Sequence, residues 1–150
     1  MAQTPEGWVK AHVTNILDEH TVFYTMPMTM GYGRSGVPDI IACVKGLFIT
    51  IEVKDCALRH RMGELRTRGK NKGKVVSEGG PTALQQAVMA DIRATGGITL
   101  LVDRHNFMRL HDFFMCLEDI NWSNTVSEYM EEVRFHAQRL DLWYERMPEL

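Results

Sequence analysis

The sequence predicts one α/β domain in which helices and strands alternate, and three observations support this fold class. A chain of 150 residues is long enough for one compact domain and short for two. Hydrophobic residues make up 45% and charged residues 24% of it, which is ordinary globular usage and excludes wholesale disorder. The apolar spacing switches along the chain in the order helix, three strands, helix, strand and further helices.

The first two predicted elements are a helix and a strand. Thr4 is a typical helix cap and Pro5 a typical first helical residue, so we predict a helix over residues 4–20. Residues 22–30 contain β-branched and aromatic side chains and are predicted to form a strand. Because proline has no backbone N–H, Pro27 would place this strand at the edge of a sheet or bend it.

A β-hairpin is predicted next. Two apolar runs, residues 37–44 and 47–54, are separated by Lys45 and Gly46, which is the spacing of a two-residue turn. Paired residue numbers then sum to 91, and side chains alternate between the two faces of the hairpin. The face expected to pack on the core consists of Ile40, Ala42, Val44, Leu47, Ile49, Ile51 and Val53.

On the opposite face the same register sets Asp39 directly across from Glu52, with Lys54 two residues further on. Opposed side chains in a sheet have β-carbons roughly 4.5–5.5 Å apart, so two carboxylates there repel each other. Mg²⁺, which is typically held by one or two carboxylates, water and substrate phosphate, would relieve this repulsion. A four-residue loop would keep the register, whereas a three-residue loop with a bulge would shift it by one. The alternative is structural: an aspartate that ends a turn and an exposed Glu–Lys pair.

The rest of the chain is predicted to form a helix, a strand and more helices. The helix covers residues 81–95 and ends at Gly96-Gly97, and residues 98–102 form a short apolar strand. From residue 106 onward the pattern is helical and stops at Pro148. An apolar stripe in this region most often packs on the protein's own core, and the alternative is the seam of a homodimer. The stripe consists of Val126, Met130, Val133, Ala137, Leu140, Tyr144 and Met147.

The order of the motifs resembles a known class of nucleases. Gly36-Val37-Pro38-Asp39, followed after the hairpin by Glu52-Val53-Lys54, is similar to the Pro-Asp…(Asp/Glu)-x-Lys signature of the PD-(D/E)XK superfamily. The features shared with small phage and bacterial VRR-NUC proteins are Glu6 with Val9 and Lys10, the Gly-x-Gly-x-x-Gly stretch before Pro38, and Thr82-x-x-Gln85 followed by Gly96-Gly97. The resemblance spans about residues 6–102. It implies a restriction-endonuclease-like αβββαβ core with a C-terminal helical extension.

The resemblance also implies a role for each residue at the end of the hairpin. The implied catalytic residues are Asp39, Glu52, Lys54 and Gln85. The implied ligands of Mg²⁺, for which Mn²⁺ would substitute, are Asp39, Glu52, the Val53 backbone carbonyl and, through a water, Glu6. Lys54 would position or activate the attacking water, and Gln85 would support the site from its helix. A metal ion used in this way lowers the pKa of bound water and stabilises charge on the phosphate.

The charge of the chain is distributed unevenly. Seventeen basic and nineteen acidic residues give a formal net charge of −2, which by itself argues against nucleic-acid binding. Residues 55–80, however, hold seven basic and three acidic residues directly after Lys54, so we expect a basic loop that contacts DNA phosphates. We divide the chain into a nuclease core at 1–104, including this loop, and a helical extension at 105–150. The predicted DNA-binding residues are Arg34, Arg59, Arg61, Arg66, Arg68, Lys70, Lys72 and Lys74.

Together these features favour a Mg²⁺-dependent endonuclease that hydrolyses DNA. The resemblance makes branched DNA, such as Holliday junctions, an attractive substrate, and a homodimer formed through the C-terminal stripe would supply two active sites. Two alternatives stay open. One is a non-catalytic DNA-binding accessory protein of a phage replication, recombination or packaging complex. The other is a protein-interaction module that uses the acidic helical tail.

Several other signals are set aside. Residues 31–36 match a dinucleotide-binding string but lead into a strand instead of a helix, and residues 69–74 lack P-loop spacing. His12 and His60 are expected to be surface or packed residues. Three cysteines make no complete disulfide framework, and no signal peptide or membrane-length apolar run is visible. We therefore expect an intracellular protein of the cytoplasm, the host's if it is phage-encoded, with no membrane partner.

Overall fold

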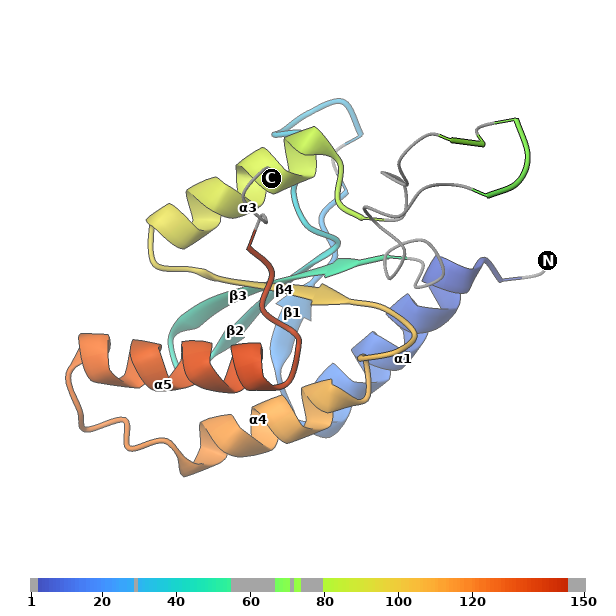
Figure 1. The fold of residues 1–150 in the computed structure, drawn as a ribbon. Helices are drawn as coiled ribbons and strands as arrows, with labels where there is room; N and C mark the ends of the chain where they lie inside the picture. Colours follow the sequence, from blue (N-terminus) through green and yellow to red (C-terminus); the bar gives the residue numbers. More distant parts are fainter. Residues whose placement is uncertain (1–2, 29, 55–66, 71, 74–79, 146–150) are drawn as a thin grey trace.

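A computed structural model describes residues 3–28, 30–54, 67–70, 72–73 and 80–145 of the chain. Within these residues the elements follow the predicted order, and the α/β class is confirmed (Figure 1). The helices are α1 (Pro5–Glu19), α3 (Ala83–Ala94), α4 (Arg109–Asp119) and α5 (Val126–Arg139). The strands are β1 (Phe23–Thr25), β2 (Ile40–Val44), β3 (Leu47–Val53) and β4 (Ile98–Val102).

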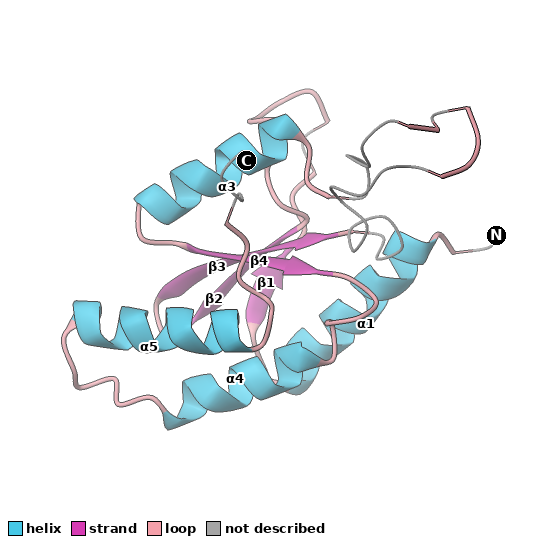
Figure 2. Cartoon of the chain, viewed as in Figure 1, coloured by secondary structure: helices cyan, strands magenta, loops and turns pink. Residues whose placement is uncertain are grey.

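The four described strands form a mixed sheet in the order β1-β2-β3-β4. β2 pairs antiparallel with β1 and with β3, whereas β3 and β4 are parallel. Parallel neighbours need a long crossover, and the chain between β3 and β4 supplies one that includes α3. As Figure 2 shows, α3 lies over one face of the sheet while α4 and α5 lie over the other, with α1 alongside them.

The hairpin has the predicted register. Pairing runs from Val44 with Leu47 to Ile40 with Ile51, so the bulged alternative is excluded. The turn residues Lys45 and Gly46 have φ of 53° and 81°, as a two-residue turn with the twist of the strands requires. One further step of the same ladder leads to Asp39 and Glu52, which therefore lie at the open end of the hairpin.

The two faces of the sheet differ in chemistry. The face toward α1, α4 and α5 carries the predicted core residues, of which all are buried except the partly buried Val44. The face toward α3 buries polar side chains, namely Thr50, Glu52 and Thr99. Large apolar burial on one face is the main source of stability, so it can offset the cost of polar burial on the other.

The first strand is shorter than predicted. Among the described residues of this stretch, only Phe23–Thr25 forms a strand, so the prediction of a strand over residues 22–30 is wrong in length. β1 runs antiparallel to β2, and its last pair joins Thr25 to Ile41, one residue from the start of β2 at Ile40. Beyond Thr25, β1 therefore has almost no strand left to pair with. Pro27 follows two residues later and has no N–H to donate. β1 lies at an edge of the sheet, as Pro27 predicted.

The C-terminal region departs from the predicted helical pattern. α5 ends at Arg139, well before Pro148, and Asp141 adopts a left-handed φ of 56°. The chain then runs beside β4, where the Leu101 N–H donates to the Leu142 carbonyl at 2.8 Å. This segment covers the outer edge of β4, and Leu142 is fully buried. The prediction that the helical pattern continues to Pro148 is therefore wrong over residues 140–145, which run beside β4.

The apolar stripe packs mainly within the chain. Val133, Ala137 and Leu140 are buried in the core, whereas Val126 is 65% exposed. A dimer seam and the division of the chain at 104/105 stay predictions. Among the described residues, no helix is both long and apolar enough to cross a membrane. Cys43 and Cys116 carry free thiols, and Cys56 lies outside the described residues.

Leu142→Ala is expected to destabilise the protein strongly, because it removes a fully buried side chain that joins the C-terminal segment to the sheet. Substitutions of this kind cost about 2–5 kcal/mol. Urea unfolding followed by circular dichroism measures the change. Val126→Ala, at an exposed site, is the control, with an expected cost within about 0.5 kcal/mol. Equal stability of the two variants would show that the segment does not pack on β4.

Candidate active site

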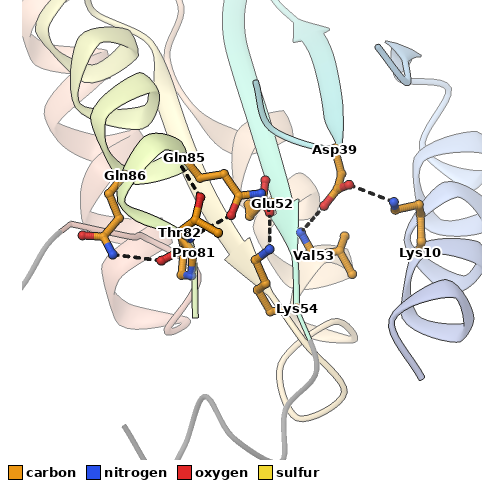
Figure 3. Close-up of polar contacts among 9 residues, drawn as sticks. All are labelled: Lys10, Asp39, Glu52, Val53, Lys54, Pro81, Thr82, Gln85 and Gln86. Atoms are coloured by element: carbon orange, nitrogen blue, oxygen red, sulfur yellow. Dashed lines mark hydrogen bonds and ion pairs between the residues drawn. The ribbon is translucent and has the colours of Figure 1, made fainter. Parts of the chain in front are cut away.

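The two carboxylates predicted to share a site lie at the ends of neighbouring strands (Figure 3). Asp39 directly precedes β2, Glu52 is the penultimate residue of β3, and Lys54 directly follows β3. α1 contributes Lys10 from one side, and the first turn of α3 contributes Gln85 from the other. Five polar side chains from three parts of the chain therefore meet at this end of the sheet.

Glu52 is fully buried beneath α3. Its Oε1 atom accepts hydrogen bonds from Lys54 Nζ at 2.8 Å and from Gln85 Nε2 at 2.5 Å. Its Oε2 atom is buried and has no hydrogen-bond partner among the described residues. An unpaired buried carboxylate oxygen is costly in a folded protein, so this atom marks a place where a proton or a cation is favoured.

The electrostatic surroundings raise the pKa of the Glu52 carboxyl from 4.5 to about 7. The largest cause is burial, which penalises the charged form, followed by the negative charge of Asp39. Lys54 opposes the shift through its hydrogen bond and its charge, and Glu6 adds a smaller upward effect. The Asp39–Glu52 repulsion inferred from the register is thus the second cause of the raised pKa of Glu52.

Asp39 is more exposed and better satisfied than Glu52. Its Oδ1 atom lies 2.8 Å from Lys10 Nζ, and its Oδ2 atom accepts the Val53 N–H at 2.9 Å. The side chains of Lys10 and Asp39 are 32% and 21% exposed. Lys10 was not among the predicted site residues. The signal that points to it is its position four residues after Glu6, which puts both on one side of α1.

Gln85 reaches Glu52 because the start of α3 fixes its side chain. Thr82 caps the helix by accepting the Gln85 N–H, and the Gln85 Oε1 atom accepts the Thr82 N–H at 2.8 Å. This reciprocal capping box occupies the carbonyl end of the amide and leaves its NH₂ group to donate to Glu52. The structure therefore brings Gln85 to the site, as the resemblance implied.

The glycine-rich link before Asp39, residues 31–36, packs against α3. Gly36 has a φ of 81°, and a Cβ there would come within 2.7 Å of Leu84 Cγ and 3.1 Å of the Leu84 backbone. Arg34 forms an ion pair with Asp91, also on α3. Because Leu84 adjoins Gln85, α3 holds both the approach to Asp39 and the carboxylate of Glu52. The predicted DNA-binding residue Arg34 thus has a protein partner.

The residues present fit a divalent cation with few protein ligands. Among the described residues, no group of three or more His, Cys, Asp and Glu side chains could hold a metal ion. Asp39 and Glu52 supply two carboxylates, the number that Mg²⁺ commonly takes alongside water and substrate phosphate. The orphaned Glu52 oxygen agrees with a ligand there. Glu6 influences the site through its charge, and its role and that of the Val53 carbonyl stay predictions.

The predicted basic loop is only partly described. Arg68, Lys70 and Lys72 are exposed. Arg59, Arg61, Arg66 and Lys74 lie outside the described residues, as does His60. His12 is a packed residue: its ring lies 3.9 Å from that of Trp8 and 5.4 Å from that of Phe107, between centroids. The prediction that His12 has a packing role is confirmed.

Glu52→Gln is expected to change the pH dependence of stability. Unfolded glutamate releases its proton near pH 4.5, whereas folded Glu52 holds its proton up to about pH 7. Between these values folding takes up a proton, so the wild-type protein loses stability as the pH rises through this window. Relative to wild type, Glu52→Gln should therefore gain up to about 3 kcal/mol across the window and nothing more above it.

Urea unfolding in the presence of a chelator, repeated across this pH range for both proteins, measures the difference. Effects of groups that do not interact with Glu52 cancel when the two curves are subtracted. A difference that stays constant with pH would contradict the raised pKa of Glu52.

Comparison with known proteins gives no relative from which a function could be inferred. No family model matches the chain, and neither does any curated protein or solved structure. The residues at the open end of the hairpin are therefore the evidence from which a function has to be argued.

Proposed function

We propose that the chain is a metal-dependent endonuclease that hydrolyses DNA phosphodiester bonds, with a restriction-endonuclease-like core of the VRR-NUC type. The observation that carries the proposal is the buried carboxylate of Glu52, which has an orphaned oxygen, faces Asp39 and touches Lys54. Asp39, Glu52 and Lys54 are also the three residues that resemble the Pro-Asp…(Asp/Glu)-x-Lys signature in the sequence.

A purely structural role for this cluster is disfavoured on energetic grounds. Replacing a buried ion pair by apolar residues of similar size is often neutral or stabilising. Glu52 also carries a raised pKa and an unsatisfied oxygen, which both lower the stability of the charged form. Perturbed carboxyl groups of this kind concentrate at functional sites, where the cost is offset by function.

In the proposed reaction each side chain has a separate task. Asp39 and Glu52 would hold Mg²⁺ or Mn²⁺, and the ion would acidify a bound water and stabilise charge on the phosphate. Lys54, whose side chain is only 14% exposed, keeps its ammonium on Glu52 and would offset the charge that develops on the phosphodiester. Gln85 holds the Glu52 carboxylate in place from α3.

The basic stretch that follows Lys54 in the sequence supports DNA as the substrate. Residues 55–80 carry a basic excess directly after Lys54, and the described members Arg68, Lys70 and Lys72 are exposed. Exposed lysines and arginines neutralise phosphates without reading bases. Branched DNA as the preferred substrate is the part of this proposal that follows from the family resemblance. A homodimer as the active form rests on the apolar stripe in the C-terminal region.

Asp39→Asn, Glu52→Gln and Lys54→Met are expected to lower the rate of Mg²⁺-dependent DNA cleavage by about 100-fold or more each, because Asp39 and Glu52 would hold the metal ion and Lys54 would offset charge on the phosphate. End-labelled linear, nicked, flapped and four-way DNA, incubated with Mg²⁺ or with a chelator, provides the measurement. Glu118→Gln makes the same change at an exposed carboxylate on α4 and is expected to cut like wild type.

Retention of wild-type cleavage by all three site variants would refute the site. Absence of cleavage with Mg²⁺ and Mn²⁺, together with salt-sensitive DNA binding, would instead support a non-catalytic DNA-binding protein.

A combined Arg68→Gln, Lys70→Gln and Lys72→Gln variant is expected to bind DNA less tightly and with a weaker salt dependence. Each lost phosphate contact reduces the slope of log K against log salt by about 1. Fluorescence anisotropy with duplex DNA over a salt series measures this slope. A control with the exposed Lys45, Arg134 and Arg139 changed to Gln has the same charge loss elsewhere. Equal slopes in the two variants would show that only net charge matters.

A further inference from the structure

The two lysines of the site are held very differently. Lys54 is 14% exposed and donates to the fully buried Glu52, so its ammonium has little freedom to leave. Lys10 is 32% exposed and pairs with Asp39 at the surface of the site. Partly exposed ion pairs of this second kind are weak and exchange readily. Lys10 is therefore the cation of the site that can be displaced.

The ion pair between Lys10 and Asp39 opposes the binding of a divalent cation to the Asp39 carboxylate. One of its oxygens faces the Lys10 ammonium at 2.8 Å, and the other accepts the Val53 N–H. A second cation at this carboxylate would be repelled by the ammonium, whose charge lies within hydrogen-bond distance. Binding at Asp39 therefore favours movement of Lys10 away from it.

The structure offers Lys10 a second partner. Glu6 lies one turn earlier on α1, and a glutamate four residues before a lysine on a helix is the favourable orientation for an ion pair. Both side chains line a hollow of about 400 Å³ together with Thr4, Pro5 and Gly7. The flexible stem of lysine allows its ammonium to move within such a space while the helix stays fixed.

We propose that Lys10 is an exchangeable counter-ion, which pairs with Asp39 in the metal-free protein and moves to Glu6 when a divalent cation binds. This inference rests on the proposed function and adds a mechanism that sets metal affinity. Glu6 then acts on the metal indirectly, as the acceptor of a displaced lysine, instead of through a bound water. Lys10 is a positioning residue in this scheme, because it acts through Asp39.

A double-mutant cycle separates the two roles of Glu6. Chelator-treated wild type, Lys10→Met, Glu6→Gln and the double variant are titrated with Mn²⁺ by isothermal calorimetry, which needs neither DNA nor catalysis. Lys10→Met should bind Mn²⁺ roughly three- to tenfold more tightly, because the competing cation is gone. Glu6→Gln should bind Mn²⁺ roughly threefold less tightly, because displaced Lys10 loses its acceptor.

The double variant is decisive. If Glu6 acts mainly through Lys10, adding Glu6→Gln to Lys10→Met weakens Mn²⁺ binding clearly less than Glu6→Gln does in wild type, because only the direct charge effect of Glu6 on Glu52 is then lost. If Glu6 holds the metal through water, the same addition weakens binding as much as it does in wild type, and the proposal is overturned. Unchanged or weaker Mn²⁺ binding by Lys10→Met overturns it as well.

Two controls complete the design. Lys45→Met makes the same change at an exposed turn, at the opposite end of the hairpin from Asp39, and should bind Mn²⁺ like wild type. Lys10→Arg keeps the positive charge at Asp39 and should not show the gain of Lys10→Met. Failure of wild type to bind Mn²⁺ refutes the metal site itself, whereas wild-type binding with the wrong order of variants refutes only the role of Lys10.

Discussion

Burial of the Glu52 carboxylate between β3 and α3 is the constraint on which the arrangement of the site depends. The parallel pairing of β3 with β4 requires a crossover, and the helix of that crossover covers Glu52. Desolvation raises the pKa of Glu52, and among the described residues Lys54 and Gln85 are the two that donate hydrogen bonds to its carboxylate. The Glu52 Oε2 atom has no hydrogen-bond partner in the part of the chain that the structure describes, so the site favours an added cation or proton.

The charges of the site are nearly balanced as the structure stands, and this balance bears on the proposed substrate. Two carboxylates, on Asp39 and Glu52, are matched by two ammonium groups, on Lys10 and Lys54. If the site binds a divalent cation as proposed, the open end of the hairpin carries an excess of positive charge. A phosphodiester carries one negative charge, so its attraction to the site would depend on the bound cation.

The sequence predicted those parts of the structure that are determined locally. A period of two and a Lys-Gly turn specified the hairpin register, and with it the meeting of Asp39 and Glu52. The spacing of Glu6 and Lys10 is a local pattern, but it does not indicate Asp39, which lies in a different element, as the partner of Lys10, so sequence reasoning missed the pair. The segment that contains Leu142 was predicted as helix for a similar reason. Its pairing with β4 depends on a left-handed Asp141, whose carbonyl accepts from the buried Asn106.

The unequal faces of the sheet explain how one small domain tolerates a buried carboxylate with an unsatisfied oxygen. Apolar side chains from α1, α4, α5 and the sheet form a continuous core on one face, away from Glu52. On the other face α3 touches the glycine-rich link at Gly36 and the buried carboxylate through adjacent residues, Leu84 and Gln85. A small shift of α3 would therefore move the approach to Asp39 and the support of Glu52 together. The helix couples the two carboxylates mechanically, whereas the opposite core keeps the sheet itself in place.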